Sequence, residues 1–171
     1  HIKNAYWRAA EESKPRLLFT AHGLPEDVIK AGDPYQAQVE KTVELITQVL
    51  SIDGLEWRIC YQSKVGPKKW IGPSTEEEII NAGEDNMAVL VVPVAFVSEH
   101  SETLVELDIK YRELAEEHSV PGYWRVPALS CDPYFIQTLA DLCLKDLSTQ
   151  HCEFCESEDA AEDCALRKRA A

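Results

Sequence analysis

The chain has 171 residues, 45% of them hydrophobic, which is enough for one domain with a packed core or for one half of a larger two-lobed protein. Its formal net charge of -13 argues against a nucleic-acid binder, because phosphate recognition depends on clustered lysine and arginine side chains. No stretch approaches the roughly 20 consecutive apolar residues of a membrane-spanning helix, and the start lacks a signal-peptide pattern, so we expect a soluble, non-secreted chain.

Short apolar runs alternate with segments of helical period along the chain. The runs predict strands over residues 16–20, 55–62, 87–96 and 122–129. The periodic segments predict helices over residues 34–50, 75–82, 103–118 and 133–147. This alternation requires crossover connections, so we expect a doubly wound α/β fold with a mostly parallel sheet and helices on both faces. We expect one domain over residues 1–148, followed by an acidic, cysteine-containing tail over residues 149–171.

The first candidate residue is His22, which follows the first predicted strand in a turn rich in Gly and Pro. Ligands of doubly wound folds bind outside the carboxyl ends of the strands, where this turn is expected. A neutral imidazole there can accept a proton or ligate a metal ion. The alternative is a histidine that only hydrogen-bonds within its own turn.

The second candidate is an acidic segment after the most apolar predicted strand. Glu99, Glu102 and Glu106 stand at i, i+3 and i+7, so a regular α-helix would place them on one face, with His100 beside them. Carboxylates so close together repel, which raises their pKa values and suits the row to receiving protons or holding a divalent cation. The alternative is that the dipole of the helix simply favours acidic residues in its first turn.

The third candidate is the loop over residues 62–73, which contains two glycines, two prolines and Trp70. A loop so constrained can hold the indole against a flat apolar ligand, while its lysines pair with carboxylates of that ligand. The alternative is that Trp70 only closes the core beneath the loop.

These segments together resemble the successive signatures of the ferrochelatases, the lyases that insert ferrous iron into protoporphyrin. The resemblance is carried by AHGLP at 21–25, QSKVGP and WIGP within 62–73, and FVSEHSETLVELD at 96–108, with GDPY at 32–35 in addition. It extends from about residue 15 to residue 147 and implies the carboxyl-terminal half of a two-lobed enzyme.

The resemblance also implies roles for single residues. His22 becomes a metal ligand or the proton acceptor for a pyrrole nitrogen, and Glu102 becomes its acidic counterpart across the porphyrin. His100 and Glu99 belong to the catalytic polar row, and Glu106 lies on the path of the iron. The residues implied to bind the macrocycle are Trp70, Phe96, Ser63 and Lys64.

The tail contains Cys152 and Cys155 in a C-x-x-C pair and a third cysteine, Cys164. It resembles the three-cysteine extension of cluster-bearing ferrochelatases, which implies a [2Fe–2S] cluster whose fourth ligand is Cys143 or lies outside this chain. Structural zinc and free thiols are the alternatives.

The implied partners are protoporphyrin IX, Fe2+ and the amino-terminal half of the same enzyme, while a homodimer and a peripheral membrane contact stay open. The expected location is the bacterial cytoplasm, with the inner membrane nearby, or the matrix side of mitochondria in a eukaryote. Two other functions remain: a tetrapyrrole chelatase acting with cobalt or nickel, and a non-catalytic heme or iron–sulfur binding module.

Overall fold

The computed structural model describes residues 1–148, which form a four-stranded parallel sheet with helices. The strands are β1 (Pro15–His22), β2 (Trp57–Gln62), β3 (Ala88–Pro93) and β4 (Tyr123–Arg125), and their order in the sheet is β2-β1-β3-β4. All three pairings are parallel, so the carboxyl ends of the strands meet at one edge of the sheet. The predicted α/β class with a parallel sheet is confirmed.

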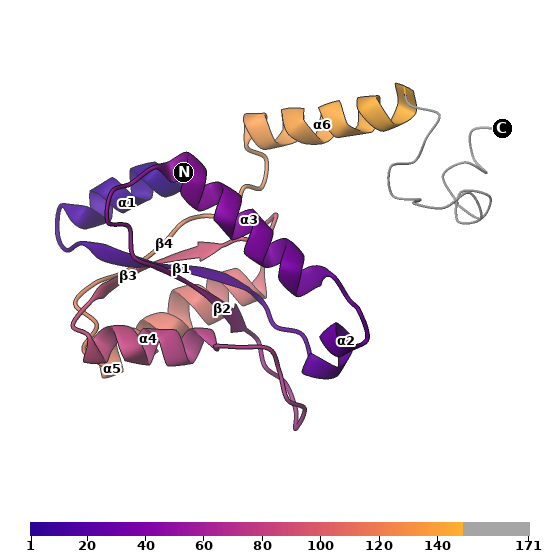
Figure 1. The fold of residues 1–171 in the computed structure, drawn as a ribbon. Coiled ribbons are helices and arrows are strands. Elements are labelled where there is room, and N and C mark those ends of the chain that lie inside the picture. The colour runs from indigo at the N-terminus through magenta and orange to yellow at the C-terminus, as the bar shows by residue number, and fades with distance from the viewer. Residues whose placement is uncertain (149–171) are drawn as a thin grey trace. The chain divides into compact units, whose positions relative to one another are not determined.

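Helices cover both faces of this sheet (Figure 1). On one face, α1 (Ile2–Ala10) and α3 (Tyr35–Leu50) pack against Leu17 and Phe19 of β1. On the other face, Leu18 packs against α4 (Thr75–Glu84), the π-helix η1 (Glu102–Lys110) and α5 (Tyr111–Glu117). All residues of β1 before His22 are therefore buried, as expected for a central strand between two layers of helices.

The predicted elements agree with the structure in type but differ at three places. The chain forms α1 and the short helix α2 (Glu26–Lys30), neither of which was predicted. The single helix expected over residues 103–118 consists of η1 followed by α5. In η1 the backbone N–H of Tyr111 reaches the carbonyl of Glu106, five residues back, which is the wider hydrogen bonding of a π-helix.

The chain divides into two compact units, His1–Leu129 and Ser130–Ala171. The sheet and its helices form the first, and the described part of the second contains α6 (Pro133–Ser148). The predicted start of the tail at residue 149 coincides with the end of the described residues and stays a prediction. Within residues 1–148, no helix has both the length and the hydrophobicity needed to cross a bilayer.

Candidate functional site

His22 is the last residue of β1 and lies opposite Gln62, the last residue of β2. The imidazole Nδ1 lies 2.6 Å from the carbonyl oxygen of Gly23. A carbonyl can only accept a hydrogen bond, so Nδ1 carries the hydrogen, and in the neutral ring Nε2 has a free lone pair. The Tyr35 hydroxyl donates to the His22 carbonyl at 3.0 Å, which helps to hold the turn. The His22 side chain is 39% exposed, so the imidazole is accessible from this edge of the sheet.

Glu102 is the first residue of η1, and its Oε1 lies 3.9 Å from Nε2 of His22. A ring between the two side chains would hold them about 7 Å apart, because each face needs an ordinary contact of 3.5–4.0 Å. The two side chains are closer than this in the structure, and the expectation that they face each other across the porphyrin stays a prediction. Both groups lie side by side and present one imidazole and one carboxylate to the same space.

Glu106 lies one turn further along η1 and binds the end of β2. Its carboxylate accepts hydrogen bonds from Gln62 Nε2 at 3.0 Å, from the backbone N–H of Ser63 at 3.0 Å and from the Ser63 hydroxyl. The Tyr111 hydroxyl lies 3.1 Å from the same carboxylate and 3.0 Å from that of Glu76. A carboxylate offers about four lone-pair positions, so these contacts nearly saturate Glu106. Burial and the two carboxylates raise the pKa of Tyr111, which therefore keeps its proton.

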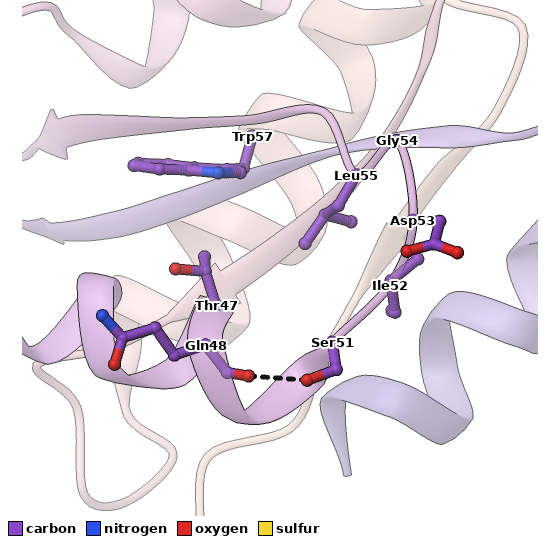
Figure 2. Close-up of a pocket in the computed structure, with 8 residues that line it drawn as sticks. All are labelled: Thr47, Gln48, Ser51, Ile52, Asp53, Gly54, Leu55 and Trp57. Carbon is purple, nitrogen blue, oxygen red and sulfur yellow. Dashed lines mark hydrogen bonds between the residues drawn. The ribbon is translucent and has the colours of Figure 1, made fainter.

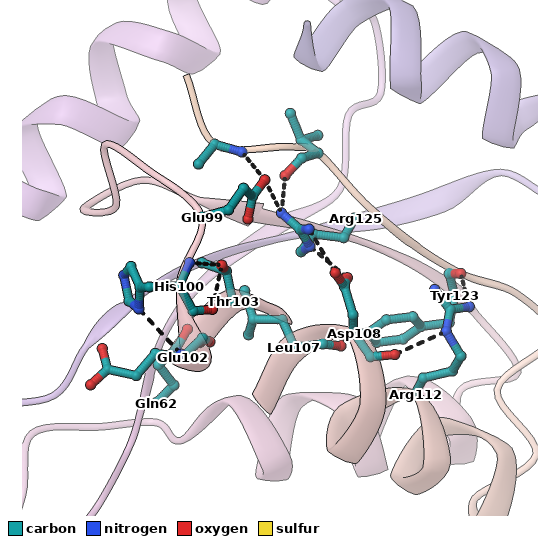
Figure 3. A network of polar contacts seen from close by, with 12 residues as sticks. Gln62, Glu99, His100, Glu102, Thr103, Leu107, Asp108, Arg112, Tyr123 and Arg125 are labelled. Atoms are coloured by element: carbon teal, nitrogen blue, oxygen red, sulfur yellow. Dashed lines mark hydrogen bonds and ion pairs between the residues drawn. The ribbon is translucent and has the colours of Figure 1, made fainter. Parts of the chain in front are cut away.

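Glu99 does not share a face with Glu102 and Glu106, because it precedes η1. Its Oε1 accepts a hydrogen bond from Arg125 at 3.0 Å and another from the backbone N–H of Ala128 at 2.8 Å. Figure 3 shows Arg125 between this carboxylate and that of Asp108. Burial raises the pKa of Glu99, but hydrogen bonds from Thr103, Ala128 and Arg125 outweigh burial and lower it. The predicted rise by mutual repulsion is wrong for this residue.

His100 and Phe96 lie beside the acidic helix. The backbone N–H of Glu102 donates to Nδ1 of His100 at 3.2 Å, so the hydrogen of a neutral ring is on Nε2 (Figure 3). The centroid of the Phe96 ring lies 5.2 Å from that of the His100 imidazole, and Phe96 is only 8% exposed. Phe96 therefore supports His100 from within the core in this structure.

The loop after β2 brings Trp70 close to His22, with 6.3 Å between the ring centroids. A backbone bridge between Trp70 and Pro25 ties this loop to the His22 turn. Two of its lysines pair with carboxylates of α2: Lys68 contacts Asp27 at 3.2 Å and Lys69 contacts Glu26 at 2.8 Å. Lys64 is exposed, whereas Ser63 is held by Glu106.

The described residues do not contain a group of three or more His, Cys, Asp or Glu side chains able to hold a metal ion. Cys152, Cys155 and Cys164 lie outside the described residues, and Cys143 is an exposed free thiol on α6. The residues described do not by themselves form a site for an iron–sulfur cluster.

A surface pocket of about 580 Å³ lies elsewhere, between the end of α3 and the start of β2 (Figure 2). Thr47, Ser51, Asp53 and Trp57 are among its lining residues. The starts of parallel strands lie at the opposite sheet edge from their carboxyl ends, so this pocket is separate from His22 and Glu102.

Sequence reasoning gave no role to three residues that hold this site together. Arg125 and Tyr111 lie in a short strand and a helix with no pattern that distinguishes them. Gln62 is the first residue of the QSKVGP motif and the last residue of the strand predicted over residues 55–62. Its place at the end of a strand was the one signal in the sequence that could have marked it as a site residue.

Comparison with known proteins gives a consistent result. The family model described as Ferrochelatase matches residues 1–147. The chain is 54% identical to the ferrochelatase of Wolbachia sp. subsp. Drosophila simulans (strain wRi), covering 84% of this chain and 44% of the relative. It is 55% identical to that of Caulobacter vibrioides (strain NA1000 / CB15N), covering 81% of this chain and 40% of the relative. The chain therefore spans less than half the length of these relatives.

A solved structure shares the fold. It is the putative cobalamin (vitamin B12) biosynthesis CbiX protein from Marinobacter aquaeolei VT8, with a TM-score of 0.54 and 19% identity. The match covers 77% of this chain and 96% of that protein. At this level of identity the likeness concerns architecture alone.

Proposed function

The chain belongs to the ferrochelatase family, and on that premise we propose that it forms the wall of an active site that inserts Fe2+ into protoporphyrin IX to give protoheme. The observation that carries the proposal is the short distance of 3.9 Å between His22 Nε2 and Glu102 Oε1. Both atoms lie at the edge of the sheet where the strands end. Ligand sites of parallel α/β sheets lie at this edge.

Metal insertion replaces two pyrrole N–H protons by one Fe2+ ion, so the site needs two proton acceptors or one acceptor with an exit for protons. His22 offers the Nε2 lone pair, because its Nδ1 hydrogen is used on Gly23. Glu102 offers a carboxylate beside it. We assign His22 as proton acceptor and Glu102 as a coupled base and ligand for the incoming iron.

Further features implied by the motif resemblance are proposals for this chain. The chain is one lobe of a two-lobed enzyme, the carboxyl-terminal one by its motifs, and the other lobe completes the porphyrin pocket together with Trp70, Ser63 and Lys64. The compared relatives named above are bacterial, which supports a bacterial origin, and a location in the cytoplasm is proposed with it. The tail cysteines Cys152, Cys155 and Cys164 are proposed to bind a [2Fe–2S] cluster, and visible absorption before and after dithionite tests this.

Iron insertion into protoporphyrin by the full-length enzyme tests the main proposal. His22→Ala and Glu102→Gln are each expected to lower kcat by about 100-fold or more, the usual contribution of a positioned acid or base. Matched controls are His118→Ala and Glu117→Gln, which change exposed side chains at the last residue of α5 and the residue after it. Wild-type rates in both site variants would overturn the proposal.

Competition between Fe2+, Co2+ and Ni2+ in the same assay tests the identity of the metal. A ferrochelatase is expected to convert Fe2+ with the highest kcat/KM. Preference for cobalt or nickel would assign the chain to another tetrapyrrole chelation reaction.

A further inference from the structure

Gln62 is a completely buried amide at the centre of the candidate site, with an exposed fraction of 0%. It is the last residue of β2 and lies opposite His22 in the register of β1 and β2. Burying an amide is costly unless its oxygen and nitrogen both find partners. The partners of Gln62 therefore indicate what this residue does.

Both ends of the amide are engaged by different elements. The Oε1 atom accepts a hydrogen bond from the Thr20 hydroxyl of β1 at 3.1 Å. The Nε2 atom donates to the backbone carbonyl of Glu102 at 2.9 Å and to the carboxylate of Glu106 at 3.0 Å. The carboxylate can only accept, which fixes the orientation of the amide, with its nitrogen toward η1.

The two donated bonds hold successive turns of η1 against the sheet. The bond to the backbone carbonyl of Glu102 fixes the main chain of the residue whose carboxylate lies beside His22. The position of that carboxylate therefore depends on Gln62. Ser63 strengthens the same attachment through its two bonds to Glu106. Ser63 adopts a positive φ of 65°, a conformation uncommon for residues other than glycine.

We propose that Gln62 is a positioning residue that fixes the carboxylate of Glu102 relative to the imidazole of His22. The inference rests on the proposed function, because it assigns Gln62 a duty toward that pair. Glu106 then serves as the anchor that Gln62 and Ser63 bind, and it does not take part as an iron ligand. Gln62 needs no contact with porphyrin or iron for this role.

Gln62→Met in the full-length enzyme removes the hydrogen bonds while keeping a side chain of similar length. We expect kcat for iron insertion to fall by about 10-fold to 100-fold, as for a displaced catalytic group, with KM for protoporphyrin within about threefold of wild type. Thr75→Val is the matched control. It removes the neighbouring buried contact between the Thr75 and Thr20 hydroxyls, 2.9 Å apart, without touching η1, and should leave kcat within about threefold.

A second pair of measurements separates positioning from simple loss of packing. If Gln62 acts through Glu102, Gln62→Met should cost less than about threefold in kcat when added to Glu102→Asp, whose carboxylate is already displaced.

The outcomes distinguish this inference from the proposed function. If His22→Ala and Glu102→Gln abolish insertion but Gln62→Met leaves kcat unchanged, the inference fails and the proposed function stands. Fully multiplicative losses of Gln62→Met and Glu102→Asp would also overturn the inference. If His22→Ala and Glu102→Gln keep wild-type rates, the proposed function itself fails.

Discussion

Arg125 binds Asp108 through two parallel hydrogen bonds, from Nε to Oδ1 at 2.6 Å and from Nη2 to Oδ2 at 2.7 Å. The same guanidinium donates to Glu99 at 3.0 Å, and its side chain is only 9% exposed. These bonds join β4 to η1 and to the segment before η1 (Figure 3). The Arg125 network therefore holds both ends of the acidic segment that carries Glu102.

Replacing Arg125 by Met should destabilise the protein by about 3 kcal/mol, because it leaves two partly buried carboxylates without their cation. Urea unfolding measures this loss. The control is Arg58→Met, which changes an exposed guanidinium that donates to the carbonyl of the neighbouring Trp57. It should change the free energy of unfolding by no more than about 0.5 kcal/mol. Equal effects of the two substitutions would contradict the assignment.

The lowered pKa of Glu99 predicts a dependence of stability on pH. A carboxyl group whose pKa lies lower in the folded than in the unfolded chain stabilises the fold above its unfolded pKa, here near 4.5. That stabilisation is lost as the pH falls through the folded pKa. Unfolding of wild type and Glu99→Gln at neutral pH and at about pH 3.5 should therefore show a stability difference that shrinks in acid. A difference independent of pH would argue against an ionised Glu99 in the Arg125 network.

Gly83→Ala should destabilise the protein although it replaces glycine by alanine inside α4. Such a change ordinarily stabilises a helix by about 1 kcal/mol. Here a Cβ on Gly83 would lie 2.3 Å from the carbonyl oxygen of His118, so the backbone must move. We expect a net loss of about 1–3 kcal/mol, measured by thermal unfolding. Asn81→Ala, at an exposed position of the same helix, is the control and should not destabilise. A higher melting temperature for Gly83→Ala would refute the close approach.

The three described free cysteines should differ sharply in reactivity. Cys60 is 0% exposed, and burial raises the pKa of its thiol to about 12. Cys131 and Cys143 are exposed. Iodoacetamide at about pH 8 should label the two exposed thiols in the folded protein and Cys60 only after denaturant is added. Mass spectrometry of the tryptic peptides gives the readout, and rapid native labelling of Cys60 would show that the sheet opens there.

The fold class and the His22 position could be predicted because they depend on patterns that a sequence displays directly. Strands of buried apolar residues alternate with helices, and His22 is the last residue of one such strand. The acidic row could not be placed correctly, because its prediction assumed the 100° per residue of an α-helix. Glu99 precedes η1 and pairs with Arg125, whereas Glu102, the first residue of η1, lies beside His22. Arg125 and Gln62 were missed because their roles depend on partners from distant parts of the chain.

The order of the strands also bears on how the chain folds. The central strand β1 pairs on one side with β2 and on the other with β3, so that Leu17 meets both Trp57 and Leu90. Neither partner is local, and each pairing closes a loop that contains at least one helix. Such topologies fold more slowly than those built from neighbouring contacts, because chain entropy is lost before the sheet gains its hydrogen bonds. The edge that bears His22 and Glu102 is therefore complete only once both crossovers have closed.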